Sequence, residues 1–155
     1  MYKTILVPLD GSHLAEAILP HAQQLAALFE AELIYLQVIE LSHIVNLPDV
    51  DENDFQALPH IGKEDMQKHV EAAQNYLSEM VQFAQENGIP ARSRIAYGPV
   101  ASSIINTAVE ERVDLIAMAS HGCGGLLGVY YGSVAAGVLQ RVDRPLLIVR
   151  SQEDL

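Results

Sequence analysis

The sequence lacks the features that mark secreted, membrane-spanning or disulfide-stabilised proteins. Its 155 residues include one cysteine, so no internal disulfide can form and a reducing compartment is expected. No apolar run approaches the roughly 20 residues that a membrane-spanning helix needs. The start, Met-Tyr-Lys-Thr-Ile, does not have the layout of a signal peptide. We therefore expect a cytoplasmic protein that does not contact the membrane.

Basic residues are also scarce, with 9 Lys and Arg against 20 Asp and Glu and a net charge of −11. Binding to nucleic acid needs a clustered basic face, so nucleic acid is not an expected partner. A phosphate ligand is still possible, because exposed charges are screened beyond about 8 Å whereas backbone N–H groups act at contact. For a ligand with three phosphates we expect a divalent cation such as Mg²⁺ to help.

Half of the residues are apolar and 19% are charged, which indicates one compact domain over residues 1–155. Apolar runs and helical periodicities alternate along the chain. Strands are predicted at residues 3–8, 32–39, 92–97, 114–118 and 145–150. Helices are predicted after Ser12, over residues 63–87 and over residues 134–141, with Gly88 ending the second of these. A further helix is predicted to begin at Pro99, and its buried side carries Val100, Ile104, Ala108 and Val109.

Two segments interrupt this pattern. Pro20 lies inside the first helical periodicity and predicts a kink there. Residues 40–62 have no clear periodicity and contain Pro48, Pro59 and the acidic run 49–54, so they are predicted to form an irregular insert, either a lid or a floppy excursion.

The alternation of strands and helices predicts an α/β fold of the Rossmann-like, doubly wound type. We expect a five-stranded parallel sheet in the order 3-2-1-4-5, with helices on both faces. Ligands of such sheets bind beyond the carboxyl ends of the strands, where the winding reverses. Residues 8–12, residues 38–40 and the segment after Met118 should converge there. Asp10 could then accept hydrogen bonds from a ribose or a base, or could form an Asx turn instead.

The segment from Ala119 to Ser133 has the composition of an anion cradle. Its glycines at 122, 124, 125, 128 and 132 allow a backbone to turn and to approach a ligand closely. The predicted helix after Gly132 adds unpaired N–H groups and the positive end of its dipole, which favour a phosphate. The alternative is a mobile loop in which Ser133 only caps the helix.

These residues resemble the universal stress protein family, over essentially the whole chain. Nucleotide-binding members carry a glycine, two residues, a second glycine, nine residues and then Gly-Ser or Gly-Thr. In this sequence the corresponding positions of the motif are Ala119, Gly122 and Gly132-Ser133. The opening segment Ile5-Leu-Val-Pro-Leu-Asp-Gly-Ser12 and the closing segment Arg144-Pro-Leu-Leu-Ile-Val149 also resemble the family. The sequence departs from the family pattern at two places, because alanine replaces glycine at 119 and Cys123 stands where members often have a basic residue.

The resemblance implies an adenine nucleotide, with its base near Pro8, Asp10 and the backbone of Val38. Its ribose and phosphates would meet Gly122, Gly132, Ser133 and Val134. With the adjoining Leu9, Ser12, Met118 and Ala119, these residues form the predicted nucleotide site. ATP and AMP are both possible ligands, as is a cyclic nucleotide. The resemblance also implies a homodimer through the strand at 146–150, which an apolar sheet edge favours.

No residue is predicted to be catalytic and no protein metal site is predicted. Ser120-His121 lies in no nucleophile-elbow pattern, and we interpret His121 as a loop residue. Cys123 could have a redox role but is more simply a small side chain facing solvent. The leading hypothesis is a dimeric module that senses an adenine nucleotide in the stress response and acts on an unknown protein partner. The alternatives are a slow ATPase or autophosphorylating enzyme, and a nucleotide-free dimeric interaction protein.

Overall fold

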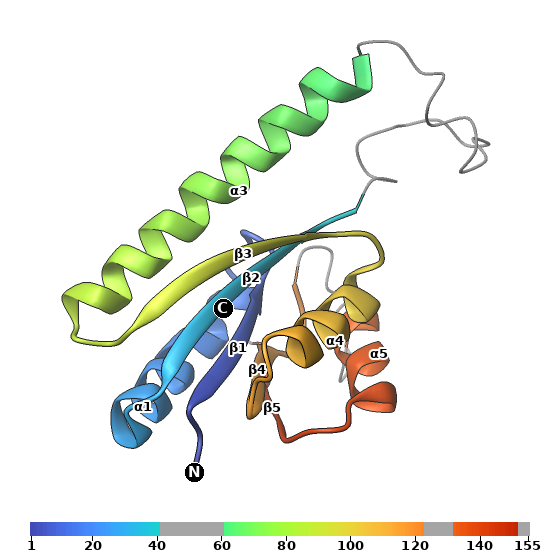
Figure 1. Cartoon of the computed structure of the whole chain (residues 1–155). Helices are drawn as coiled ribbons and strands as arrows, with labels where there is room; N and C mark the ends of the chain where they lie inside the picture. Colours follow the sequence, from blue (N-terminus) through green and yellow to red (C-terminus); the bar gives the residue numbers. More distant parts are fainter. Residues whose placement is uncertain (41–60, 123–131, 152–155) are drawn as a thin grey trace.

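Helices and strands alternate along the chain in the computed structural model, which describes residues 1–40, 61–122 and 132–151 (Figure 1). The strands are β1 (Thr4–Leu9), β2 (Glu32–Ile39), β3 (Ala91–Tyr97), β4 (Leu115–Ala119) and β5 (Leu146–Val149). The helices are the 3-10 helix η1 (Ala15–Ile18), α1 (Leu19–Phe29), α3 (Ile61–Glu86), α4 (Val100–Glu110) and α5 (Ser133–Arg141). None of the described helices is both long enough and apolar enough to cross a bilayer.

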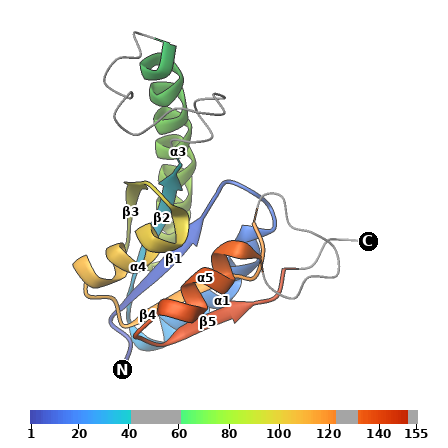
Figure 2. The ribbon, with the colours of Figure 1, turned by 90° about the vertical axis from the view of Figure 1, so that its right-hand side faces the viewer.

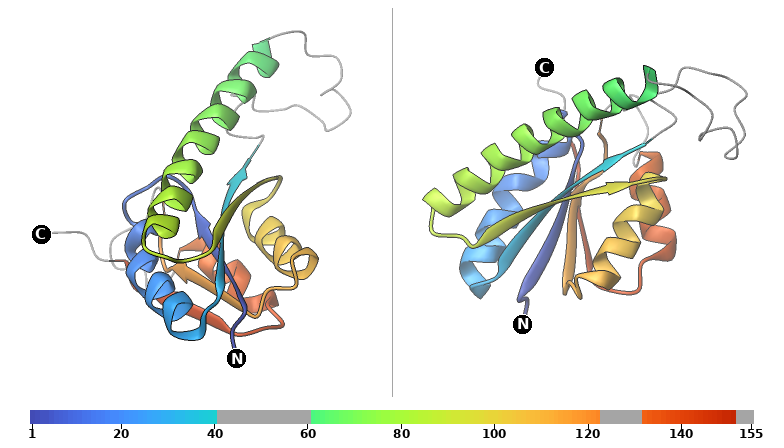
Figure 3. Two further views of the ribbon diagram at one scale, coloured as in Figure 1. Left: turned by 60° about the vertical axis from the view of Figure 1, so that its left-hand side comes forward. Right: turned by 45° about the horizontal axis from the view of Figure 1, so that its top comes forward.

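The five strands form one parallel sheet in the order β3-β2-β1-β4-β5. The predicted fold class and strand order are therefore confirmed. Figures 2 and 3 show α1 and α3 on one face of the sheet and α4 and α5 on the other. Since all strands run the same way, their carboxyl ends lie along a single edge, and the loops that follow β1, β2 and β4 leave from that edge.

Each face of the sheet has its own apolar core, because side chains alternate between the faces along a strand. On β1, Ile5 and Val7 point to the core under α1 and α3, whereas Leu6 points to the core under α4 and α5. All three are fully buried. Burial stabilises each such side chain by about 1.5–3 kcal/mol, so the central strand that carries the site is firmly held.

Helix α3 ends as the sequence predicts. Gly88 has a φ of +77°, which glycine adopts without strain. Its N–H donates to Gln85 O at 3.0 Å, and the N–H of Ile89 donates to Ala84 O at 2.9 Å. These two bonds form a Schellman motif that satisfies the last carbonyl groups of the helix.

Two details of the helix predictions were wrong. Pro20 does not kink a continuous helix, because the chain forms the separate 3-10 turn η1 and then starts α1 at Leu19, with Pro20 in the first turn. A proline there costs no internal hydrogen bond. Val109 is not on the buried side of α4, since 52% of its surface is exposed.

The predicted insert lies mostly outside the described residues. Cys123 and the glycines at 124, 125 and 128 also lie outside them. The end of the insert is described, because α3 begins at Ile61. Whether the rest acts as a lid stays a prediction.

The edge strand β3 is fastened to its neighbours by a network of ion pairs. Arg92 bonds Glu32 on β2 at 2.5 Å and Glu111 after α4 at 2.6 Å. Arg94 bonds the other oxygen of Glu111 at 2.7 Å and also pairs with Glu110. Because Glu111 accepts from both guanidinium groups, its pKa is lowered, with the bond from Arg92 as the largest cause.

Candidate functional site

The predicted site residues gather at the carboxyl edge of the sheet. Pro8 and Leu9 end β1, Met118 and Ala119 end β4, and Val38 lies near the end of β2. Strand β1 lies between β2 and β4, so these ends are neighbours. Ser133 and Val134 begin α5, which covers the face that Val38 and Met118 share.

The turn after β1 is built by Asp10, Gly11 and Ser12. Gly11 has a φ of +83°, and the Oδ1 atom of Asp10 accepts the N–H of Ser12 at 2.9 Å. This is the Asx turn that the sequence left open as an alternative for Asp10. The Ser12 hydroxyl oxygen then accepts the N–H of Ala15, the first residue of η1, at 3.2 Å.

The second carboxylate oxygen of Asp10 brings this turn against the glycine segment. It fills the space beside Gly122 where the Cβ atom of any other residue would lie. Only glycine fits at position 122 without a shift of the Asp10 carboxylate or of one of the two loops. Asp10 and Gly122, which are 112 positions apart in the sequence, are thus in direct contact.

The end of the glycine segment is closed by Gly132. Its N–H donates to Ser120 O at 2.8 Å, and a Cβ atom at position 132 would lie 3.1 Å from that same oxygen. Gly132 is the N-cap of α5 with a φ of −70°, so its role is the close approach of the backbone and not an unusual conformation. Ser133 is the first residue of the helix and does not cap it with its side chain, contrary to the alternative from the sequence.

Three polar residues that the sequence analysis did not assign to the site lie behind this cradle. Ser120 is only 2% exposed, and its hydroxyl is 2.9 Å from Nδ1 of His121. The N–H of Ser151 donates to the same hydroxyl oxygen at 3.0 Å. The Ser151 hydroxyl lies 3.0 Å from Leu14 O and 3.1 Å from His121 O, with a single proton to donate to them. Ser151 therefore joins the loops that follow β1 and β4.

Acidic groups lie close to the turn that carries Asp10. The Tyr76 hydroxyl on α3 donates to Glu16 at 3.0 Å, and Glu16 also lies 3.5 Å from the imidazole of His13. Burial, followed by the bond to Glu16 and the charges of Glu16 and Asp10, raises the pKa of Tyr76. Tyr76 is therefore a neutral hydrogen-bond donor that links α3 to η1. In the described ranges, no three side chains of the metal-binding types come together.

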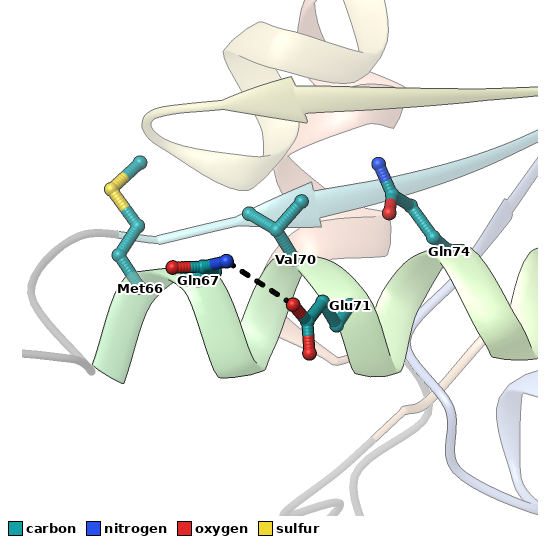
Figure 4. Close-up of a pocket in the computed structure, with 5 residues that line it drawn as sticks. All are labelled: Met66, Gln67, Val70, Glu71 and Gln74. Atoms are coloured by element: carbon teal, nitrogen blue, oxygen red, sulfur yellow. Dashed lines mark hydrogen bonds between the residues drawn. The ribbon is translucent and has the colours of Figure 1, made fainter. Parts of the chain in front are cut away.

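A hollow formed by described residues lies elsewhere, on α3. It measures about 440 Å³ and is lined by Met66, Gln67, Val70, Glu71 and Gln74 (Figure 4). Met66, Val70 and Gln74 point to one side of the helix, while Gln67 donates to Glu71 at 3.3 Å. These residues all come from one helix and bring no converging donors together. The contacts at the carboxyl edge are therefore better evidence for a binding site than this hollow.

Comparison with known proteins agrees with the fold and with the family that the sequence resembles. The profile of the Universal stress protein family matches residues 1–150. Universal stress protein MJ0531 of Methanocaldococcus jannaschii is 30% identical over 150 residues, covering 97% of this chain and 83% of that protein. The solved structure of MJ0577, from the same organism, has 29% identity and a TM-score of 0.83 over 99% of both chains.

A further solved structure, a universal stress protein in complex with cAMP, shares the fold. It has 24% identity and a TM-score of 0.64, covering 97% of this chain and 98% of that one. With the profile matched over nearly its whole length, the chain belongs to the universal stress protein family.

Proposed function

We propose that this protein binds an adenine nucleotide at the carboxyl edge of β1 and β4. The observation that carries the proposal is the pair of close approaches at Gly122 and Gly132, where the Asp10 carboxylate and the Ser120 carbonyl oxygen lie in the space that a side chain would need. Both approaches bring the loops after β1 and β4 close to the N-cap of α5. The base would lie near Pro8, Asp10 and Val38, and the ribose and phosphates near Gly122, Gly132 and the first turn of α5.

Main-chain donors suit this role in an acidic chain. The first N–H groups of α5, those of residues 133–135, have no carbonyl partner within the helix, because its first turn is closed by the bond from Ala136 N–H to Gly132 O at 3.0 Å. The dipole of α5 favours negative charge at the same place. The family member solved with cAMP supports an adenine ligand for this fold, although its 24% identity is too low to identify the ligand here.

AMP, ADP, ATP and a cyclic nucleotide all fit this chemistry, and we favour AMP or ATP. Mg²⁺ accompanying ATP would be coordinated mainly by phosphate oxygens and water, as this ion usually is. We further propose that the protein acts as a homodimer paired through β5, whose outer edge is the end of the sheet. Nucleotide binding would then be the signal that this dimeric module reads in the stress response, in the cytoplasm.

A calorimetric titration tests the proposal with AMP, ADP, ATP and cAMP, each with and without magnesium. Binding of at least one of them is expected, and Gly132→Val should abolish it, because the added side chain meets Ser120 O and fills the cradle. The absence of heat with every nucleotide at millimolar concentration, from protein shown to be folded, would overturn the proposal. Turnover of labelled ATP above that of Gly132→Val would instead favour the slow ATPase.

A further inference from the structure

The side chain of Ser120 fixes the proton position on a neighbouring histidine. Ser120 is almost fully buried, so its hydroxyl proton needs an acceptor within the protein. Its oxygen already accepts the N–H of Ser151, and among the described residues the acceptor within reach of its proton is Nδ1 of His121, at 2.9 Å. Nδ1 of His121 is therefore the acceptor of this bond, which places the ring proton on Nε2.

This arrangement leaves Nε2–H of His121 as a buried donor. The atom has almost no contact with solvent and has no hydrogen-bond partner among the described residues. A buried donor without an acceptor destabilises a folded protein by about 1–3 kcal/mol, and such groups are rare away from functional sites. The histidine backbone is held on both sides as well, since its N–H and carbonyl both contact the Ser151 hydroxyl.

The ring of His121 lies at the start of α5. Its Cδ2 atom, which is bonded to Nε2, would be 3.6 Å from a Cβ atom placed on Gly132. Nε2–H is thus close to Gly132, the N-cap residue of α5, on the edge of the ring that faces Gly132. A donor in this position adds to the unpaired N–H groups of the first turn, which already favour an anion.

Resting on the function proposed above, we propose that Nε2–H of His121 donates a hydrogen bond to a phosphate oxygen of the bound nucleotide. An anionic acceptor makes such a bond shorter and about twice as strong as a neutral one. Ser120 is the positioning residue, because it holds the ring in the tautomer that can donate. His121 would then be a side-chain donor for phosphate that acts together with the main-chain N–H groups of α5.

Affinities of AMP and adenosine for three proteins test this assignment. In His121→Phe an aromatic ring is kept and the donor is lost, so AMP should bind about tenfold more weakly while adenosine binds within about twofold of the original. In His121→Gln the side-chain amide can replace Nε2–H, so the affinity for AMP should stay within about threefold. Circular dichroism checks that both variants are folded.

Nitrogen NMR of the unaltered protein provides a second readout that does not depend on any variant folding. Before ligand is added, Nε2 of His121 should carry the proton and Nδ1 should not. On addition of AMP the Nε2–H proton should shift downfield, and adenosine should not produce this shift.

Three results would overturn the assignment: equal AMP affinity in His121→Phe and the original protein, equal losses of AMP and adenosine affinity, or a proton on Nδ1 in the free protein. These results differ from failure of the proposed function. If the original protein binds neither AMP nor adenosine, then the nucleotide site and the role of His121 fall together.

Discussion

The carboxylate of Asp10 lies against Gly122, in the space that a side chain at position 122 would take. The contact joins the turn after β1 to the loop after β4, on either side of the proposed nucleotide site. The two loops are therefore held together by a contact between the Asp10 carboxylate and the Gly122 backbone, which leaves no room for a side chain at position 122.

Gly122→Ala should disturb the site more than the fold. The added methyl group overlaps Asp10, so that carboxylate or the loop must move, and nucleotide affinity should fall by about tenfold or more. Calorimetry with AMP measures the effect. Gly88→Ala is the matched control, because Gly88 has a φ of +77° at the far end of α3 and its replacement should lower stability without changing affinity. Equal affinity losses in both variants would contradict the local explanation.

Glu111→Gln should loosen the edge strand β3. The substitution weakens the bonds from Arg92 and Arg94, whose side chains are 46% and 30% exposed. Because solvent screens such pairs, we expect a loss of about 1 kcal/mol in the free energy of unfolding, smaller in high salt. Urea denaturation measures it. Glu79→Gln on an exposed part of α3 removes the same charge, and a comparable loss there would count against the network.

Asp114→Asn should reduce stability in a pH-dependent way. The Oδ2 atom of Asp114 accepts the N–H groups of Lys3 and Thr4 at 2.8 and 2.9 Å, and the bond from Lys3 is the largest cause of its lowered pKa. A carboxyl group with a lowered folded-state pKa stabilises the protein above its unfolded pKa, and that contribution is lost as the pH falls through the folded value.

The difference in unfolding free energy between the original protein and Asp114→Asn should therefore be about 1–2 kcal/mol at neutral pH and should shrink in acid. Asp65→Asn on α3 makes the same charge change as a control. A difference that stays constant from neutral to acidic pH would show that the charge of Asp114 is not what matters.

Ile148→Glu should convert the proposed dimer to monomer. Ile148 lies on β5, at the end of the sheet, and a charged residue on an edge strand opposes pairing with a second strand. Sedimentation at micromolar concentration measures the change, with circular dichroism to confirm the fold. Val109→Glu introduces the same charge on an exposed part of α4 and should leave the association unchanged. A monomeric original protein would refute the dimer directly.

The sequence predicted most of what the backbone does at this site. The apolar run at residues 32–39 is β2 to the residue, because a strand covered on both faces needs apolar side chains throughout. The end of α3 was also predictable, because Gly88 takes a φ of +77° there, which glycine adopts without strain. The turn η1 was missed because its side chains follow nearly the same spacing as those of an α-helix, so Pro20 seemed to lie inside one.

The polar residues behind the cradle could not be found in this way. Ser120 and Ser151 are 31 positions apart, and they meet only because β4 and β5 are paired in a register that places Ala119 opposite Val149. Ser120 followed by His121 was the only available signal, and a pair of adjacent polar residues does not reveal which of their atoms are buried. The tautomer of His121 depends on that burial, so it becomes visible only in the folded structure.

The position of Ser151 also affects how the protein should be tagged for experiments. Ser151 follows β5 and bonds with Leu14, Ser120 and His121, so a label attached at Ser151 would lie beside the proposed nucleotide site. Met1 lies at the amino end of β1, at the opposite edge of the sheet (Figure 2). Surface immobilisation through Met1 should therefore leave the proposed site accessible, and attachment at Ser151 should not.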